Sequence, residues 1–520
     1  MTDDNGTPHD THHVYIDEVH GHQQRYQRVV RFTRSSTKAA GIMLLAAIVA
    51  LVVANTPAYG TFYEFWHTHI AVGFGTFVAE MSLAHIVNDV FMAVFFLLVG
   101  LEIKYEMTAG ELVDIRQAVL PIVAAAGGVL APIGIYLALN AGSSATLQGW
   151  GVPTATDIAF ALGILALLGN RVPNGLRVFL STLAVADDII AIIVIAVFYG
   201  HAPSFGWLAA AAVVFVALVV LNRAHVYALA PYLLLGCVLW LCVFMSGVHA
   251  TIAGVLLAFA IPGTSRVNLR AFLDWSDASI AKARALYDDE SPVVAQDEYL
   301  KTVRGVARVS HQVVPPATRL EHRLYPWVYF AVLPLFALSN ADVSLVGEDI
   351  ASMMTSPVFM GVFFGLLIGK PVGIMLFSAI VVKLKISTLP EHVNWTHMLG
   401  AAILAGVGFT MAIFVANLAY ADAAFVSQAK LGILTASFVA GVLGFMFLYL
   451  QARSDERRGV AYLTMQGADT HRQTAGAEAA HDSERFAEEL GDAALAEQLA
   501  FVRRSEEGVA EIVVERQHDE

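Results

Sequence analysis

The residues PTATDIAFALGILALLGNRVPNGLRVFLSTLAVADDIIAIIVIAVFY, from Pro153 to Tyr199, form two apolar segments that a short turn separates. Three carboxylates, Asp157, Asp187 and Asp188, lie inside these segments. An ionised side chain at membrane depth costs about 3 kcal/mol on insertion scales, and such residues mark ion or proton pathways. Three acids in one helical hairpin therefore indicate that this stretch is the centre around which the other apolar segments are arranged.

The composition of the chain is that of a membrane protein with many spans. Of its 520 residues, 57% are hydrophobic, and the mean hydropathy is +0.63. Apolar runs of about 20 residues, the length that crosses a bilayer core, recur along the chain. The net charge of -13 does not indicate a nucleic-acid partner. The two cysteines, Cys237 and Cys242, lie in one apolar run and offer no disulfide or metal framework.

Polar stretches divide the chain into five predicted parts. We expect no signal peptide, because the residues before the first span are polar. The acidic C-terminal tail has apolar residues within 483–504 at spacings that favour a surface helix. The parts are a cytoplasmic N-terminal tail at 1–37, transmembrane spans one to eight at 38–262, a cytoplasmic insert at 263–324, spans nine to twelve at 325–450, and a cytoplasmic C-terminal tail at 451–520.

The fold class predicted from this pattern is an all-α polytopic membrane protein with about twelve helices. Lys and Arg gather in alternate loops, so by the positive-inside rule both termini are cytoplasmic, which requires an even number of spans. Residues 57–84 contain many aromatic residues and no Lys or Arg, and favour either a short extracellular β-hairpin or an aromatic interfacial loop. The predicted spans are 38–55, 85–103, 118–139, 153–169, 174–199, 205–222, 226–246, 247–262, 325–345, 357–381, 395–419 and 429–450.

Two of the predicted spans are interrupted. The fourth opens with the polar residues around Pro153, and the eleventh contains the sequence GVGFTM at 406–411. Gly weakens a helix, and small polar side chains can satisfy the backbone groups that a break leaves. Each interrupted span is the middle of a triplet, and the two triplets enter the membrane in opposite directions. This pattern is typical of an inverted repeat whose broken helices meet at the binding site; the alternative is that Gly-rich helices simply pack closely.

The titratable residues suggest chemistry that couples a cation to protons. Asp187 and Asp188 point about 100° apart on a helix, so one can line an ion path while the other needs a partner. Lys370, followed by Pro371 in the tenth span, is the best candidate for that partner. Carboxylate oxygens suit Na⁺, and protons would compete with Na⁺ for the same acids. Asp157, beside the broken fourth span, would offset the positive end of a half-helix.

Other charged residues give weaker signals. Glu102 and Glu106 lie at the end of the second span, where a helix end that reaches the interface is as good an interpretation as a regulatory role. His249 is flanked by small residues and is either a packing residue or a pH sensor. Asp89 lies in the second span, and Glu321 flanks the ninth.

Six motifs resemble the NhaA family of bacterial Na⁺/H⁺ antiporters, over residues 38–450 apart from the insert. The resemblance implies a transporter rather than an enzyme, with no cofactor, in the bacterial inner membrane. It implies electrogenic exchange of Na⁺ or Li⁺ for protons, serving pH and sodium homeostasis. The motifs are VFMAVFFLLVGLEIK, ATDIAFALGILALLGNRVP, the adjacent Asp pair, SGVHATIAGV, LLIGKPVGI and AGVGFTMAIF.

The resemblance also implies roles for single residues. Asp188 would be the principal ion and proton carboxylate, and Asp187 would pair with Lys370, so that Na⁺ binds at the two acids. Asp157 and Lys370 would balance the crossed half-helices, with the help of Thr156. The residues that the resemblance associates with pH regulation are Glu102, Glu106, His249, Glu321 and, as a buried acid of the second span, Asp89.

Some features depart from the family pattern. Tyr105 replaces an Arg that a familiar version of the GLEIK motif has, and Tyr325 stands where a His can occur. The insert and both tails are additional, so they bear on regulation rather than on the transport core. The family also implies a homodimer joined through the hairpin after span one, which fits the β-prone stretch 60–75.

Three other functions are weighed against this one. A Na⁺-coupled symporter for an organic anion would need a larger polar cavity, and a Lys opposite the Asp pair argues against it. An intramembrane aspartyl protease would place its two acids on separate helices around a shared water, whereas these two are adjacent. A passive channel would not need titratable pairs.

Overall fold

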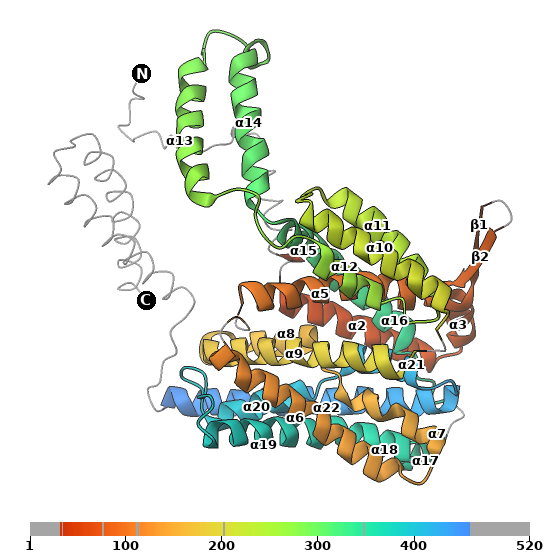
Figure 1. The fold of residues 1–520 in the computed structure, drawn as a ribbon. Coiled ribbons are helices and arrows are strands. Elements are labelled where there is room, and N and C mark those ends of the chain that lie inside the picture. Colours follow the sequence, from red (N-terminus) through yellow and green to blue (C-terminus); the bar gives the residue numbers. More distant parts are fainter. Residues whose placement is uncertain are drawn as a thin grey trace, which may run out of the picture.

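The computed structural model describes residues 32–33, 35–74, 77–110, 113, 115–200, 203–346 and 349–457. Most of the predicted N-terminal tail and the predicted surface helix at 483–504 lie outside these residues. The described part is a bundle of helices, with one helical hairpin that stands outside the bundle and one pair of strands at the bundle's opposite end (Figure 1).

Seven stretches of helix within the described residues are long and apolar enough to cross a bilayer. A bilayer core contains no water, so a spanning segment must satisfy its backbone hydrogen bonds within itself, as a helix does. The seven are α2 (Ser36–Ala54), the run of α4 (Leu83–His85), η1 (Ile86–Phe91) and α5 (Met92–Thr108), α6 (Ile115–Asn140), α9 (Asn174–Phe198), α10 (Phe205–Arg223), the run of α18 (Pro357–Phe364), η7 (Gly365–Gly369) and α19 (Lys370–Lys383), and α22 (Ala423–Arg457).

Burial distinguishes the inner helices from the outer ones. In the apolar window of α9, 61% of the residues are buried, compared with 11% in that of α10. Both helices are almost uniformly apolar, so α10 presents apolar side chains at the outside of the bundle, where a bilayer would cover them. α9, which carries the two adjacent acids, lies inside the bundle (Figure 1).

Two further spans are pairs of helices bent at a break. In the first, α7 (Ser144–Leu147) and the 3₁₀ helix η3 (Gln148–Thr154) meet α8 (Ile158–Leu167) at 43°. In the second, α20 (Trp395–Ala405) meets α21 (Phe409–Ala419) at 45°. The prediction of two interrupted spans is confirmed. The first of them begins at Ser144 instead of Pro153, because the short α-helix α7 and the 3₁₀ helix η3 supply its first half.

The remaining helices do not pass the same test of length and composition. α11 has only 17 residues and α12 has 9. With the two bent pairs, the described residues provide up to nine spans by this test, so the predicted count of twelve is not confirmed. These helices are α11 (Leu229–Met245), α12 (Ile252–Ala260), the continuous run of α15 (Pro316–Trp327), η6 (Val328–Val332) and α16 (Leu333–Asn340), and the short η4 (Gly169–Arg171) and α17 (Ile350–Thr355).

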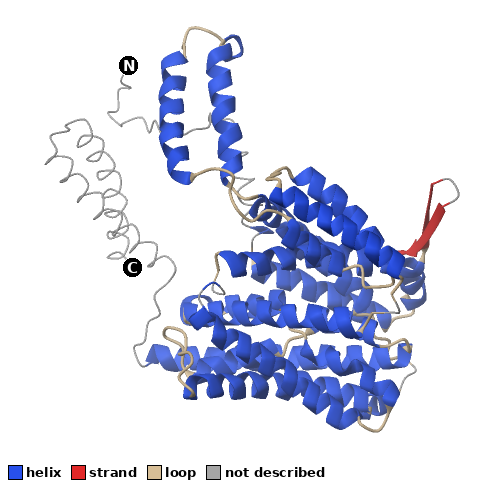
Figure 2. Ribbon diagram, viewed as in Figure 1, coloured by secondary structure: helices blue, strands red, loops and turns tan. Residues whose placement is uncertain are grey.

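The aromatic stretch after α2 contains one helix and two strands. α3 (Tyr59–His67) is a helix that the sequence analysis did not predict. It is followed by β1 (His69–Phe74) and β2 (Phe77–Ser82), which pair antiparallel from His69 opposite Ser82 to Phe74 opposite Phe77 (Figure 2). The strands project from the end of the bundle (Figure 1).

The insert forms a helical hairpin. Its helices are α13 (Leu269–Leu286) and α14 (Asp297–Val313), and the short turn η5 (Val293–Ala295) lies between them. Asn268 caps α13 by accepting hydrogen bonds from two backbone N–H groups of the first turn. The hairpin runs across the direction of the bundle helices and joins the bundle beside α15 (Figure 1).

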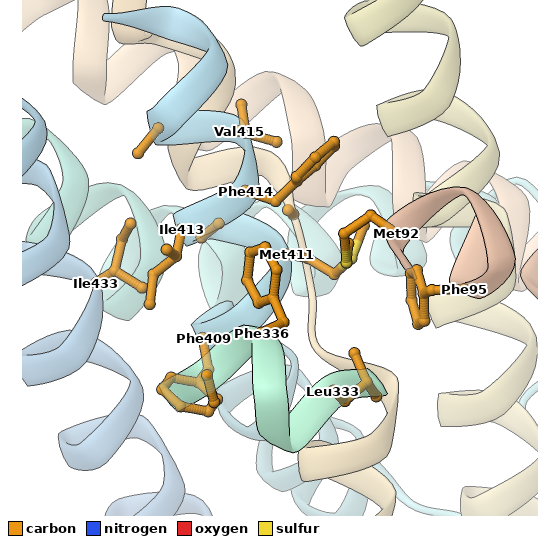
Figure 3. Close-up of a cluster of buried hydrophobic side chains, with 14 of the residues drawn as sticks. Met92, Phe95, Leu333, Phe336, Phe409, Met411, Ile413, Phe414, Val415 and Ile433 are labelled. Atoms are coloured by element: carbon orange, nitrogen blue, oxygen red, sulfur yellow. The ribbon is translucent and has the colours of Figure 1, made fainter. Parts of the chain in front are cut away.

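The largest buried apolar cluster surrounds the second break. Phe409, Met411 and Phe414 of α21 are almost fully buried against α5 and α16. Figure 3 shows these side chains together with Met92 and Phe336. The break is therefore held by packing on both sides, which fixes the position of the backbone groups that it exposes.

Candidate functional site

The two breaks cross each other in the middle of the bundle. The backbone N–H of Asp157 donates to the carbonyl oxygen of Val407 at 2.8 Å. The hydroxyl of Thr156 donates to the carbonyl oxygen of Ala405 at 3.0 Å. Backbone groups that each helix loses at its break are thus satisfied by the other broken helix, which explains how irregular backbone exists at this depth.

Glycine permits this close approach. A Cβ atom on Gly406 would lie 2.6 Å from the carbonyl oxygen of Leu366, and one on Gly408 would lie 3.0 Å from that of Ala155. Both contacts are with backbone atoms, which cannot swing away as the end of a side chain can. Gly408 is therefore required where the two breaks meet, and Gly406 where the end of α20 lies against η7.

Asp157 lies at the start of α8 with both oxygens occupied. Its Oδ1 accepts from the backbone N–H of Phe160 at 3.0 Å, which makes it the N-cap of the helix. Its Oδ2 accepts from the backbone N–H of Thr410 at 3.1 Å and from the Thr410 hydroxyl at 2.5 Å. The side chain is only 2% exposed. A carboxylate here is favourable because it faces the positive ends of two half-helices.

Lys370 reaches the crossing from the tenth predicted span. Its Nζ lies 2.5 Å from Oδ2 of Asp187 and also donates to the Thr156 hydroxyl. The side chains of Lys370 and Asp187 are 1% and 3% exposed. Removing either partner would leave the other as an unpaired buried charge, and such a change costs about 3–5 kcal/mol in other proteins.

Asp188 differs from its neighbour. It is 1% exposed and forms no ion pair within the described residues, whereas Asp187 pairs with Lys370. The Oδ1 atoms of both acids are buried with no hydrogen-bond partner among the described residues. It lines a narrow cavity of about 10 Å³ together with Asp157, Glu102, Tyr329 and Thr410. A space of this size is at the lower limit for one water molecule. An oxygen ligand without a partner, beside other oxygen atoms, is suited to receive a proton or a small hard cation.

A much larger cavity approaches this site from one end of the bundle. It has a volume of about 850 Å³ and lies between α5, α8 and α9. Thr182, at its inner end, is five residues before Asp187, or roughly 7.5 Å along the axis of α9. We call this cavity the funnel. Its lining includes Tyr105, Glu106, Leu162, Asn174, Arg177, Val178, Ser181 and Thr182.

The residues predicted to regulate the protein lie in two groups: Glu102, Glu106 and Glu321 are close enough to interact electrostatically, and so are Asp89 and His249. Glu106 lines the funnel, and Glu102 lines the narrow cavity around Asp188. Asp89 lies in the π-helix η1, and Glu321 lies in α15. Nε2 of His249 lies 2.6 Å from the carbonyl oxygen of Tyr199, at the end of α9.

Sequence reasoning missed two residues that contact this site. Thr410 contributes both of its hydrogen-bonding groups to Asp157, and Tyr329 lines the cavity of Asp188. A signal for Thr410 was present, because it is the polar residue of the interrupted eleventh span. Tyr329 gave no signal, since aromatic residues are common in membrane helices.

A group of three asparagines was also missed. Asn340 donates to Oδ1 of Asn88 at 2.9 Å, and Asn417 donates to Oδ1 of Asn340 at 2.7 Å. These bonds join η1, α16 and α21. Amide side chains in apolar helices are expensive to bury alone, and their presence in three separate spans was the signal that could have found them.

The fold and the site together define a class: a polytopic helical membrane protein in which two broken helices cross beside buried acids, an arrangement found in many secondary transporters. Residues 30–448 match the profile of the family described as Na⁺/H⁺ antiporter 1. The chain belongs to this family.

Relatives of known name cover most of the chain. It is 46% identical over 419 residues to the Na(+)/H(+) antiporter NhaA of Oleidesulfovibrio alaskensis, a match that covers 80% of this chain and 93% of the relative. The identity to the NhaA antiporter of Syntrophobacter fumaroxidans is 44%, over 79% of this chain and 88% of the relative. For the NhaA antiporter of Helicobacter pylori it is 42%, over 81% and 94%.

Proposed function

We propose that this protein exchanges Na⁺, or Li⁺, for protons across the membrane and thereby contributes to pH and sodium homeostasis. The names of its relatives support this function. The observation that carries it in this chain is the buried, unpartnered carboxylate oxygen of Asp188 beside two crossed broken helices. The chain would act as a transporter and not as an enzyme, with Na⁺, Li⁺ and protons as its substrates and no cofactor.

Asp188 is the carboxylate that binds either the cation or a proton in this proposal. Na⁺ prefers oxygen ligands, and the carboxylates of Asp187 and Asp188 would supply them. A proton on Asp188 removes the negative charge that holds the cation, so the two substrates compete for one site. Competition combined with alternating access is sufficient for exchange. The binding site then changes the side of the membrane to which it is open only when it holds one substrate or the other.

Lys370 and Asp157 have supporting roles in this scheme. Lys370 stabilises Asp187 while that acid is free of the cation, and the 2.5 Å ion pair supports this role. When a cation binds at Asp187 and Asp188, it takes the place of the ammonium group. Asp157 balances the positive ends of the half-helices, and Thr156 ties Lys370 to the crossing.

The exchange is proposed to be electrogenic. Without the cation, one proton is on Asp188 and a second is held by the Lys370–Asp187 pair, whereas one monovalent cation takes the place of both. A cycle that returns two protons for each cation moves net charge across the membrane. The rate of exchange should therefore depend on the membrane potential as well as on the pH gradient.

We propose twelve spans with both termini in the cytoplasm of a bacterium and the spans in its inner membrane. Arg171, Arg177 and Lys104 support this orientation. Arg177 lines the funnel, Arg171 lies just before the start of α9, and Lys104 lies in the last two turns of α5, the end of that run away from β2. In this orientation the funnel opens to the cytoplasm and the strands are extracellular. The exposed backbone edges of β1 and β2 would pair with a second copy, which gives a homodimer.

Regulation by pH is proposed for the acids and the histidine named above. Glu106 lines the funnel and Glu102 lines the narrow cavity, so protons that enter from the cytoplasm would meet both before they reach Asp188. Glu321 interacts electrostatically with Glu102 and would act through it, and Asp89 and His249 would act through the helices that carry them.

The test is ion exchange in proteoliposomes with a pH-sensitive dye in the lumen. An outward Na⁺ or Li⁺ gradient should acidify the lumen of liposomes that contain the protein, and a K⁺ gradient should not. An imposed membrane potential should change the rate. Sodium flux with no proton flux, or no flux at any pH between 6 and 9 (roughly the range in which such acids exchange protons), would contradict the proposal.

A further inference from the structure

A second cavity lies where the insert joins the bundle, and it shares no lining residue with the cavity of Asp188. It has a volume of about 400 Å³. We call it the insert pocket. Its walls come from the loop between α10 and α11, the segment before α13, the end of α14 and the start of α15. The lining residues are His225, Val226, Tyr227, Ala228, Arg266, His311, Gln312, Pro316 and Arg319.

The charges around the insert pocket have one sign. Arg266 and Arg319 line it with two histidines, and the described residues of its lining include no Asp or Glu. Neither arginine forms an ion pair with an acid in the part of the chain that the structure describes. Two arginines in one cavity without an acidic partner repel each other, and an anion between them would remove that cost.

The guanidinium group of Arg319 is fixed in place but incompletely bonded. Its Nη1 donates to Nδ1 of His311 at 2.7 Å, and its Nη2 donates to the carbonyl oxygen of Tyr227 at 3.3 Å. Its Nε is buried and has no hydrogen-bond partner among the described residues. Arg266 lies over the ring of Tyr227, with its Cζ 6.0 Å from the ring centre. Both guanidinium groups thus contact Tyr227, Arg266 at the ring and Arg319 at the backbone carbonyl oxygen.

The start of α15 adds to the positive potential. This helix has 12 residues and begins at Pro316, which lines the pocket, and no side chain caps its first N–H groups. The N–H of Ala317 donates to the carbonyl oxygen of Pro262 at 3.1 Å, so the helix adds its dipole rather than a free N–H group beside the pocket.

We propose that the insert pocket binds a phosphate group, carried either by an anionic phospholipid or by a soluble phosphate. Guanidinium groups bind phosphate oxygens through paired hydrogen bonds, and Nε of Arg319 is one donor that such a pair uses. The phosphate would join residues of the insert to the α10–α11 loop, and so hold α13 and α14 against the transport core. A lipid headgroup could reach it because α10 exposes apolar residues beside this loop, including Val216 and Val220.

The test measures binding to the full chain, purified in detergent. Native mass spectrometry and thermal unfolding follow the addition of dioleoylphosphatidylglycerol, dioleoylphosphatidylcholine, or inorganic phosphate against chloride at equal ionic strength. The pocket variant is Arg266→Gln with Arg319→Gln. The control variant is Arg270→Gln with Arg284→Gln, which removes the same charge from exposed positions of α13 outside the pocket.

The pocket variant should bind its ligand about tenfold more weakly, and the control less than about twofold more weakly. Binding of phosphatidylglycerol in preference to phosphatidylcholine, lost only in the pocket variant, identifies a lipid headgroup. Stabilisation by inorganic phosphate alone identifies a soluble phosphate. The proposal is overturned if neither anion binds, or if both variants lose binding equally. If the double variant does not fold, Arg266→Gln alone and Arg319→Lys, which keeps the charge but lacks Nε, give the same comparison.

This readout is independent of Na⁺/H⁺ exchange. A protein that exchanges Na⁺ for protons but binds no phosphate refutes only the insert pocket, whereas phosphate binding without exchange refutes only the proposed function.

Discussion

The hydroxyl of Thr410 lies 2.5 Å from Oδ2 of Asp157, so a residue of α21 satisfies the acid that caps α8. This contact joins positions 253 residues apart in the sequence. It links the two broken helices through one hydrogen bond to a charged group, in addition to their backbone contacts. The crossing therefore depends on residues of both halves of the chain.

The first prediction concerns this contact. Thr410→Val keeps the shape of the side chain and removes the hydroxyl, and a hydrogen bond to a charged group contributes about 1.5–3 kcal/mol. We expect a clear fall in the temperature of thermal unfolding in detergent. Thr435→Val is the control, because the Thr435 hydroxyl donates only to backbone carbonyl groups of its own helix. Equal melting temperatures for the two variants would show that the Thr410 hydroxyl does not stabilise the crossing.

The second prediction concerns the proposed carrier acid. Asp188→Asn keeps the size of the side chain but can neither gain a proton nor attract a cation. We expect Na⁺-dependent proton flux in proteoliposomes to fall to the level of empty liposomes, while the protein still inserts and binds detergent normally. Asp277→Asn, on the exposed face of α13, should keep full flux. Normal flux in Asp188→Asn would remove this residue from the mechanism.

The third prediction concerns the buried ion pair. Lys370→Met and Asp187→Asn each leave a buried polar partner unpaired, with a cost of about 3–5 kcal/mol when a buried charge remains. The double variant removes both charges, so it should unfold at a higher temperature than Lys370→Met. The comparison pair is Lys430 and Asp342, which are 3.0 Å apart but 12% and 15% exposed.

A double-mutant cycle made with Lys430→Met and Asp342→Asn should therefore give a smaller coupling free energy of unfolding than the same cycle at the buried pair. If the couplings of the two pairs are equal, burial does not strengthen the interaction of Lys370 with Asp187. Exchange should be lost in Asp187→Asn with Lys370→Met even where stability recovers, because only one of the two carboxylates proposed to bind Na⁺ remains.

The fourth prediction concerns the glycine at the second break. In Gly406→Ala the new Cβ would lie 2.6 Å from the carbonyl oxygen of Leu366, so the η7 and α20 backbones must separate. We expect overpacking to lower stability by about 1–3 kcal/mol and to reduce exchange. Gly134→Ala is the matched control within α6, because nothing lies within 4 Å of a Cβ at that position. Full exchange in Gly406→Ala would show that transport tolerates a wider separation of the η7 and α20 backbones.

Much of the architecture could be predicted from local pattern. The apolar runs predicted the helices α2, α6, α9 and α22, because a segment in a bilayer must be helical and about 20 residues long whatever its neighbours are. The two interruptions could also be predicted, since Pro153 and the glycines at 406 and 408 weaken a helix wherever it lies. The helix α3 could not, because a short aromatic segment is compatible with helix, strand or loop until tertiary contacts choose.

The candidate site divides in the same way. Asp157, Asp187, Asp188 and Lys370 were identifiable because a charge in an apolar run is unusual by itself. Thr410 offered only its position beside the glycines of the break, and Tyr329 offered no signal, since Thr and Tyr are ordinary in membrane helices and acquire a role only through the partner that they contact. The insert pocket is a further example, because its two arginines lie 53 positions apart (319 − 266) and look like ordinary surface charges in the sequence.

The sequence by itself determined which residues are buried in the membrane, where the two spans break, and which acids and which lysine carry charge there. These properties depend on the transfer free energy of each residue and on the intrinsic weakness of Gly and Pro in helices, and both are local. The residue pattern left open which acid pairs with Lys370, and the resemblance implied Asp187. Only the tertiary structure decided that this ion pair forms, that Thr410 satisfies Asp157, and that the Oδ1 atoms of Asp187 and Asp188 have no partner among the described residues. Those outcomes depend on the rotation and crossing of helices that are hundreds of residues apart, and hydrogen bonds of 2.5–3.1 Å allow little error in that geometry.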